Sequence, residues 1–243
     1  MTDSENERCR VLFLLAGYRA SGKTTALRIA NTRDDLALFN PSVMSDFKRV
    51  RGLPGSPSKN SGFHSLKTLE ENCLREYELV GVHYDMLLPL QVAINDRFIQ
   101  SYSRLTWRQR TPDMMGCLIR ESLENGFLYN CIHQKLSEII RLASGADRIE
   151  VSIIQSDWAT NKSAWLERAQ RSTSLSLEDL QSQPKYSFNL AAFHTDPDLG
   201  EELYNFVHRT WYELMDLWGV NYMRVFRSGS CYDCQASPAH AAI

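Results

Sequence analysis

The stretch that decides the fold is VLFLLAGYRASGKTTALRIA, residues Val11–Ala30. It begins with a short apolar run that ends at Gly17, which is typical of a strand covered on both faces. A turn containing glycines follows, and the residues from Gly22 to about Asn31 favour a helix. We therefore predict a buried strand, a tight turn and a helix in direct succession.

The turn contains the pattern G-x-x-x-x-G-K-[ST], completed by Gly17, Gly22, Lys23 and Thr24. Its glycines permit backbone angles that other residues avoid, so successive N–H groups turn inward beside the positive end of the helix. The result is a concave anion site in which Lys23 reaches the β- and γ-phosphates and the Thr24 hydroxyl holds Mg²⁺. The residues predicted to contact the nucleotide are Gly17, Tyr18, Arg19, Ala20, Ser21, Gly22, Lys23, Thr24 and Thr25.

This stretch resembles the Walker A motif of the P-loop nucleoside triphosphatase superfamily. The resemblance implies a three-layer α/β/α fold with a mainly parallel five-stranded sheet, and it implies binding of a nucleoside triphosphate, ATP by default, with Mg²⁺. The alternative is a chance match on a glycine turn, which the strand before the turn and the helix after it disfavour.

Length and composition set further bounds. The chain has 243 residues with 43% hydrophobic and 23% charged residues, enough for one α/β domain with insertions. A net charge of −2 argues against a nucleic-acid footprint over the whole surface, so we expect no nucleic-acid partner. No apolar run approaches the ~20 residues that span a membrane, and the polar N-terminal residues are unlike a signal peptide. We therefore expect no membrane partner, a cytoplasmic location and reduced cysteines, with the C-x-x-C of Cys231 and Cys234 only a weak metal or redox motif.

We predict a single domain over residues 10–227, with a disordered lead at 1–9 and a flexible tail at 228–243. Strands are predicted near residues 11–16, 36–39, 77–84, 148–155 and 222–226. The clearest helix is predicted from Thr195 to Gly219, because apolar residues recur there on one stripe. These elements alternate as expected for a parallel sheet with helices on both faces.

Three segments lie between the predicted strands. Residues 89–145 form a helical insertion, in which Thr111–Pro112–Asp113 is a strong helix start. The polar stretch 42–67 is either a plain surface loop or a flap that binds the acceptor. Residues 156–187 are a lid candidate, because their second half is rich in serine and weakly patterned.

Asp85 follows the predicted strand 77–84 and resembles the Walker B aspartate, which helps to hold the magnesium ion in a P-loop site. Parallel strands end at the same edge of a sheet, so Gly17, Asp85 and Asp157 are predicted to converge on one cleft. The alternative for Asp85 is a capping role for the helix that follows it.

The layout of the strands resembles the branch of the superfamily that contains the nucleotide and small-molecule kinases. In that branch, arginines between the fourth and fifth strands close over the phosphates, and Arg168 and Arg171 fall in that interval. The resemblance thus implies a catalytic set of Lys23, Asp85, Arg168 and Arg171, with Thr24 and Asp85 at the metal. Exposed helix arginines are the alternative for Arg168 and Arg171, and the general base is left open between Asp46, Asp157 and Asp85.

The expected function is Mg-dependent transfer of the γ-phosphoryl group of ATP to a small-molecule acceptor. Two alternatives stay open: a nucleotide-dependent regulatory or assembly NTPase, and a sulfotransferase-like transferase. A local basic cluster of Arg104, Arg108 and Arg110 beside Trp107 either faces an anionic substrate or lies in a solvated surface turn. The acceptor, the choice between ATP and GTP, and the oligomeric state do not follow from the sequence.

Overall fold

The structure, a computed structural model, describes residues 11–23, 25, 36–39, 79–143, 147–228 and 231–236. Several predictions lie outside these residues: the lead at 1–9, the hydroxyl of Thr24, and the polar stretch 42–67 with its candidate base Asp46.

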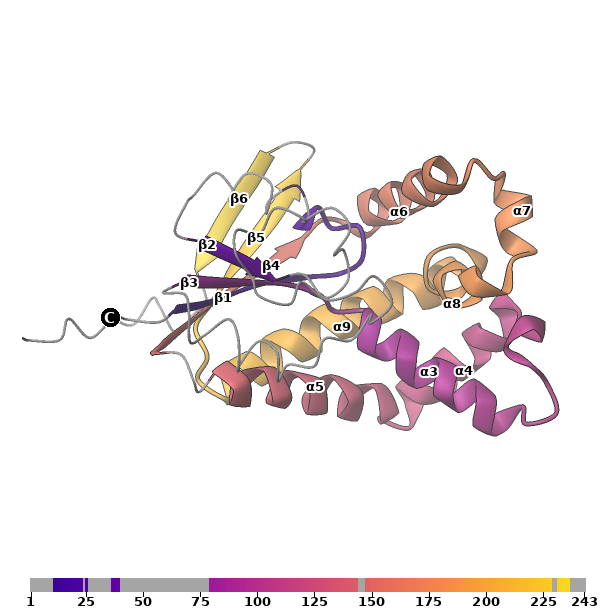
Figure 1. Ribbon diagram of the computed structural model, residues 1–243, viewed down its shortest axis with the longest axis horizontal. Helices are drawn as coiled ribbons and strands as arrows, with labels where there is room; N and C mark the ends of the chain where they lie inside the picture. The colour runs from indigo at the N-terminus through magenta and orange to yellow at the C-terminus, as the bar shows by residue number, and fades with distance from the viewer. Residues whose placement is uncertain are drawn as a thin grey trace, which may run out of the picture.

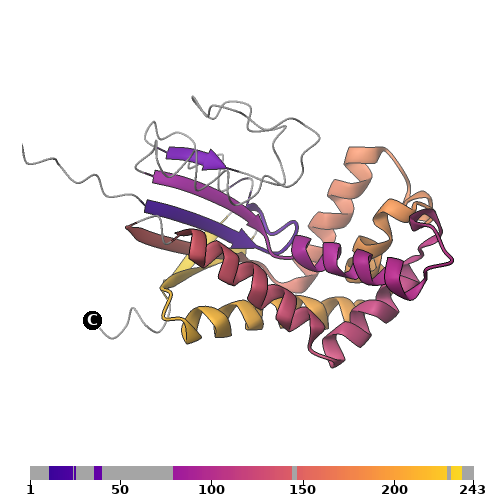
Figure 2. The same ribbon diagram turned by 60° about the horizontal axis from the view of Figure 1, so that its bottom comes forward.

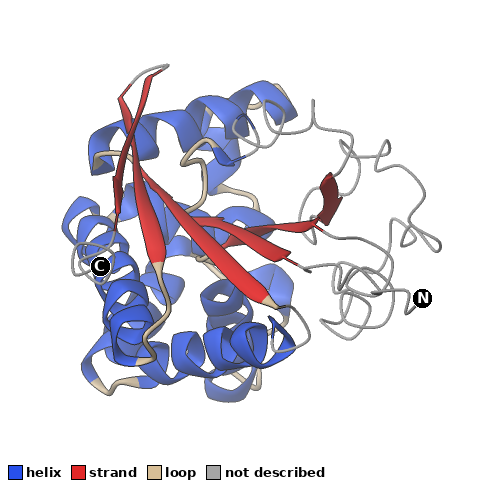
Figure 3. Cartoon of the chain, turned by 90° about the vertical axis from the view of Figure 1, so that its left-hand side faces the viewer, coloured by secondary structure: helices blue, strands red, loops and turns tan. Residues whose placement is uncertain are grey.

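A sheet organises the described residues, with the strand order β2-β3-β1-β4-β5-β6 (Figure 1). Its strands are β1 (Val11–Gly17), β2 (Leu36–Phe39), β3 (Leu79–Asp85), β4 (Arg148–Gln155), β5 (Tyr222–Ser228) and β6 (Cys231–Ala236). Neighbouring strands are parallel except for β5 and β6, and they twist across the sheet (Figure 3). The mainly parallel sheet confirms the α/β class.

The number of strands differs from the five that we predicted, because a sixth strand, β6, lies within the predicted flexible tail. It pairs with β5 in an antiparallel register that runs from Ser228↔Cys231 to Met223↔Ala236. Without it, β5 would present unpaired N–H and C=O groups at the edge of the sheet. Main-chain pairing explains this strand, whereas its side-chain pattern gives little strand signal.

Strand β1 lies inside the sheet between β3 and β4, and Leu12, Leu14 and Ala16 are fully buried. The register places Gly17 opposite Asp85 on one side and opposite Ile154 on the other. The predicted phosphate loop therefore leaves the sheet directly beside the end of β3.

Helices α5 (Phe127–Ala143) and α9 (Pro197–Leu217) lie along one face of the sheet (Figure 2). Helix α9 starts where predicted: the Asp196 side chain caps it by accepting a hydrogen bond from the N–H of Leu199 at 3.1 Å. Its buried stripe includes Leu199, Leu203, Val207, Trp211 and Leu214. The third layer of the predicted α/β/α arrangement stays a prediction.

A group of helices stands beyond the carboxyl ends of the parallel strands (Figures 1 and 2). It consists of α3 (Leu88–Ser101), α4 (Pro112–Glu124), α8 (Ser187–Leu190) and the π-helical turn η4 (Ala191–Thr195), which we call the helical lobe. Helix α4 packs against α3, α8 and η4. The Thr111 side chain caps α4 by accepting from the N–H of Met114 at 3.3 Å, as the sequence predicts.

The lid candidate contains two helices with side-chain caps, α6 (Trp158–Thr173) and α7 (Leu177–Gln181), followed by the 3-10 turn η3 (Pro184–Tyr186). Ser176 and Asp179 form a capping box at the start of α7, so one serine of this serine-rich segment serves as a helix cap. Trp158, the first residue of α6, packs closely on Gly200 of α9: a Cβ on Gly200 would lie 2.7 Å from the Trp158 ring and 2.9 Å from the carbonyl oxygen of Ala192.

Candidate functional site

The turn after β1 folds back on itself. The N–H of Ser21 donates to the carbonyl of Tyr18 at 3.2 Å, and the N–H of Thr25 donates to the carbonyl of Gly22 at 3.0 Å. Gly22 has a φ of 96° and Ala20 has a φ of 66°. The left-handed conformation of Ala20 is strained for a residue with a Cβ, and such strain is often found at binding sites.

Gly17 is required by close packing. A Cβ at this position would lie 2.6 Å from the carbonyl oxygen of Ile154 and 2.6 Å from the hydroxyl of Ser21. Because β4 runs directly beside the end of β1, the turn can leave the sheet here only without a side chain. The predicted first glycine of the motif thus has a packing reason in this fold.

Lys23 is buried, with only 5% of its surface exposed. Its Nζ donates to the carbonyl oxygens of Gly17 at 2.8 Å and Tyr18 at 2.5 Å, and it lies 3.5 Å from the hydroxyl of Ser21. Burial lowers the pKa of this amine to about 8. The turn therefore wraps around its own ammonium group.

Asp85 lies next to this turn and pairs with it. Its Oδ2 accepts from the Nε of Arg19 at 2.9 Å, and its Oδ1 accepts from the N–H of Leu87 at 3.0 Å. Burial by itself raises the pKa of the Asp85 carboxyl, but the charges of Arg19 and Lys23 outweigh it, so this pKa is lowered from 3.8. Leu87, and not Asp85, is the N-cap residue of α3, but the Asp85 carboxylate accepts from the N–H of that residue, so a role at the start of this helix is not contradicted.

Arg19 joins the turn to the helical lobe. Its Nη1 donates to the Oε1 of Gln91 on α3 at 2.8 Å and also to the Oδ1 of Asn189 on α8. With its bond to Asp85, the guanidinium therefore connects the turn, β3, α3 and α8. We predicted Arg19 only as one residue of the nucleotide loop, and the contributions of Gln91 and Asn189 were missed.

The carboxylate of Asp85 suits a hard cation such as Mg²⁺, because it is oxygen-rich and kept ionised. Its Oδ2 accepts from Arg19 and its Oδ1 accepts from the N–H of Leu87, so a metal ion would compete with these donors for the carboxylate oxygens. Within the described part of the chain, no three His, Cys, Asp or Glu side chains gather as a ready-made metal site.

The two predicted lid arginines lie on α6, and both are exposed. Arg168 lies close enough to Lys23 for its charge to contribute to the lowered pKa of that amine. For Arg171, the described residues provide no contact with the turn or with Asp85. The structure thus brings one of the two arginines into electrostatic range of the site.

Asp157 has a structural role that the sequence analysis did not give it. It is the N-cap of α6, and its Oδ1 accepts from the N–H of Thr160 at 2.8 Å. Its hydrogen bonds with Thr160 lower the pKa of this carboxyl from 3.8. As a general base, Asp157 would have to give up this cap.

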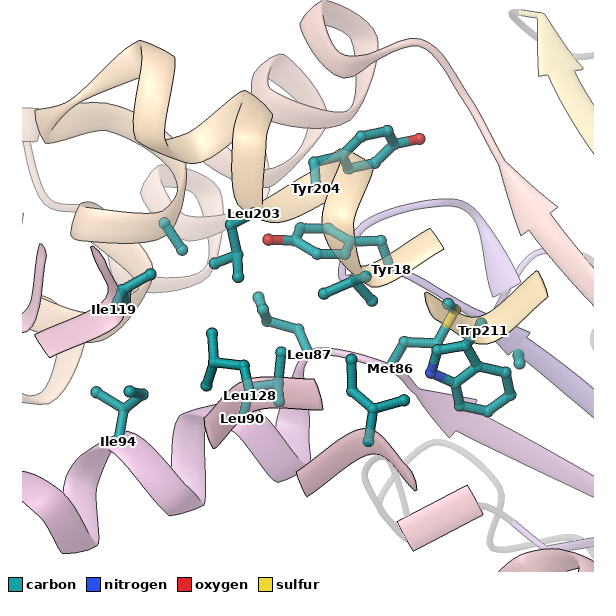
Figure 4. Close-up of a cluster of buried hydrophobic side chains, with 14 of the residues drawn as sticks. Tyr18, Met86, Leu87, Leu90, Ile94, Ile119, Leu128, Leu203, Tyr204 and Trp211 are labelled. Atoms are coloured by element: carbon teal, nitrogen blue, oxygen red, sulfur yellow. The ribbon is translucent and has the colours of Figure 1, made fainter. Parts of the chain in front are cut away.

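An aromatic cluster supports the turn from beneath. The buried ring of Tyr18 lies edge-on to Tyr204, with a centroid distance of 5.0 Å (Figure 4). It also lies edge-on to Phe193 at 5.5 Å, and its centroid is 6.0 Å from that of the His208 ring. Burial lowers the pKa of His208 to about 4, so its ring is neutral near pH 7. Among the described residues, neither the hydroxyl of Tyr18 nor the Nε2 of His208 has a hydrogen-bond partner. Tyr204 and His208 are four residues apart on α9, and this spacing was the sequence signal that could have placed both rings on one helix face.

The basic cluster near Trp107 does not belong to this site. Asp85 precedes the start of α3, whereas Trp107 follows its end, and a helix of 14 residues is about 20 Å long. Trp107 is 53% exposed, and the guanidinium groups of Arg108 and Arg110 lie over its ring at 5.5 and 5.9 Å. Arg110 also donates to the carbonyl of Pro184 at 2.8 Å.

Comparison with protein-family models and with curated proteins finds no match to this chain. In the part of the chain that the structure describes, no helix is both long and apolar enough to cross a bilayer.

Proposed function

We propose that this chain is an ATP-binding phosphotransferase that transfers the γ-phosphoryl group to a small-molecule acceptor in a Mg-dependent reaction. The register between β1 and β3 carries the proposal. Because Gly17 and Asp85 are paired residues, the predicted phosphate loop and a largely shielded carboxylate with a lowered pKa leave the sheet side by side. This is the juxtaposition that a triphosphate and its metal ion require.

In this proposal, Lys23 exchanges the carbonyl oxygens of Gly17 and Tyr18 for oxygens of the triphosphate. The exchange is favourable because a phosphate carries full negative charge whereas a carbonyl does not. Backbone N–H groups of the turn orient the phosphates, and the exposed Arg168 supplies positive charge from α6. Asp85 and Thr24 would hold Mg²⁺, which neutralises charge on the phosphate oxygens when it is bound.

The helical lobe provides the place for an acceptor. It stands beyond the carboxyl edge of the sheet, where ligands of parallel sheets bind (Figure 1). Gln91 and Asn189 face the loop from the lobe, as their bonds to Arg19 establish. Their neutral amide groups, beside a guanidinium, suit a small polar acceptor.

The variant Lys23→Ala tests this function, with Lys135→Ala as the matched control. Lys135 is a partly exposed lysine of α5 that pairs with Glu138, far along the chain from the loop. We expect Lys23→Ala to lower turnover about a hundredfold or more, because a fixed charge on the transferred group is lost. Lys135→Ala should keep wild-type turnover.

The assay incubates the wild type with Mg-ATP and a metabolite pool and searches for a newly phosphorylated small molecule by mass spectrometry. Slow ATP hydrolysis without such a product would point instead to the regulatory or assembly NTPase. Wild-type turnover in Lys23→Ala would show that the site is wrongly assigned.

A further inference from the structure

The guanidinium of Arg19 has an unusual set of partners for a residue of a phosphate loop. One charged group, the Asp85 carboxylate, and two neutral carbonyl oxygens, of Gln91 and Asn189, accept its hydrogen bonds. The side chains of Arg19 and Asp85 are 18% and 11% exposed, so this ion pair is largely shielded from water. A pair of this kind holds together only while both charges are present.

The pair creates a conflict with the role of Asp85 at a metal ion. If Asp85 turns to Mg²⁺, Arg19 loses the only acid to which it is bonded in the described part of the chain. Gln91 and Asn189 still orient the guanidinium, but they do not neutralise it. A buried guanidinium then requires another anion nearby.

The position of Arg19 indicates which anion that is. Arg19 is the second residue after Gly17 in the turn that wraps around Lys23, so its backbone belongs to the predicted phosphate site. We propose that Arg19 is a phosphate-binding residue, which exchanges the Asp85 carboxylate for a phosphate oxygen when Asp85 turns to the metal ion. This inference rests on the proposed function.

The exchange keeps the Arg19 guanidinium paired, because a phosphate oxygen replaces the Asp85 carboxylate oxygen as the anionic acceptor of its N–H groups. The phosphate can be the γ-phosphate of the nucleotide or a phosphate on the acceptor. Since the Nη1 of Arg19 also holds Gln91 and Asn189, the bound phosphate becomes linked to α3 and α8 of the helical lobe. Phosphate binding and the position of the lobe are thereby coupled.

Calorimetric binding of three ligands tests the proposal: Mg-ADP, a Mg-bound non-hydrolysable ATP analogue, and Mg-ADP with added orthophosphate. The variants are Arg19→Gln, which removes the charge, and Arg19→Lys, which keeps the charge but removes the fork. Arg120→Gln is the matched control, because Arg120 pairs with Asp196 on the exposed surface. Arg19→Lys also serves if Arg19→Gln does not fold.

For Arg19→Gln we expect the ATP analogue to bind about tenfold or more weakly, and Mg-ADP to bind within about twofold of the wild type. That result assigns the exchange to the γ-phosphate. If the effect appears only with Mg-ADP plus orthophosphate, the exchanged group is the phosphate of the acceptor. Arg19→Lys should show a smaller loss with the same pattern, and Arg120→Gln none.

Two results would overturn the proposal for Arg19: equal losses of Mg-ADP and ATP-analogue binding, which indicate a purely structural role, or no change with any ligand. A wild type that binds Mg-ADP but fails in the turnover assay refutes the proposed transfer and leaves the role of Arg19 testable by binding. A wild type that binds no Mg-nucleotide overturns both proposals.

Discussion

Asp85 and Asp157 occupy similar places at the ends of two strands but lie in contrasting surroundings. Each comes at the end of a parallel strand, Asp85 at the end of β3 and Asp157 just after β4. Asp85 is largely shielded in an ion pair with Arg19, whereas Asp157 is exposed and caps α6. Both carboxyls have a lowered pKa, the first mainly through neighbouring charges that outweigh burial and the second through hydrogen bonds with Thr160.

The difference shows that a strand-end carboxylate has no fixed meaning by itself. What separates the two regions is the partner: a cation of the phosphate loop in one, and the N–H groups of a helix start in the other. Removing a carboxylate that pairs with a shielded cation should therefore lower stability more than removing a carboxylate that caps an exposed helix start.

The largest expected effect is in the buried region. Asp85→Ala should lower the free energy of unfolding by up to about 3 kcal/mol, because the largely shielded Arg19 is left without a counter-ion. Urea denaturation of the wild type and of both alanine variants measures this. A loss for Asp85→Ala no greater than that for Asp157→Ala would contradict the assignment of a buried ion pair.

As the pH falls, the aromatic cluster around His208 should lose stability before the exposed cap at Asp157 does. The pKa of His208 is about 4 in the folded chain and about 6.5 when unfolded, so the unfolded state takes up a proton first as the pH falls. Stability should therefore fall between pH 6.5 and pH 4, by up to about 3 kcal/mol from this group. The Asp157 carboxylate, with its lowered pKa, should contribute to the acid loss only below about pH 4.

Urea denaturation of the wild type and of His208→Asn at pH 7 and pH 4.5 tests this order. The loss of stability on acidification should be smaller in the variant. An identical loss in both proteins would show that His208 does not titrate in this window.

The smallest expected effect is at the cap. Asp157→Ala should cost about 1 kcal/mol of unfolding free energy, and Asp157→Asn a few tenths, because an amide oxygen also accepts from the N–H of Thr160. Neither variant should change the affinity for Mg-nucleotide in calorimetry. A clear loss of affinity would place Asp157 in the cleft as a working group and erase the contrast with Asp85.

Local sequence patterns predicted several elements correctly. Strand β1, the capped start of α4 at Thr111 and the start of α9 at Asp196 follow from apolar periodicity and capping residues close by in the chain. The cap at Asp157 was missed, although Asp is a common N-cap residue and Thr160 stands three residues later. Strand β6 was missed because its pairing with β5, more than its own pattern, makes it a strand.

The Arg19 contacts could not be predicted from local patterns. Its partners Asp85, Gln91 and Asn189 are 66, 72 and 170 residues away in the sequence. Only the folded arrangement of β1, β3 and the helical lobe brings them together. The motif predicts a phosphate loop, whereas the side chains that contact Arg19 in that loop follow only from the tertiary structure.

The contact between Trp158 and Gly200 fixes the first residue of α6 against α9. A methyl group on Gly200 would lie 2.7 Å from the indole and 2.9 Å from the Ala192 carbonyl oxygen, so Gly200→Ala requires a shift where α6, α9 and η4 meet, and we expect the start of α6 to move. Arg168 lies ten residues farther along α6, about 15 Å from Trp158, so a small tilt of the helix at Trp158 gives a larger displacement of Arg168. One added carbon atom on α9 would thus change how far the Arg168 charge stands from Lys23.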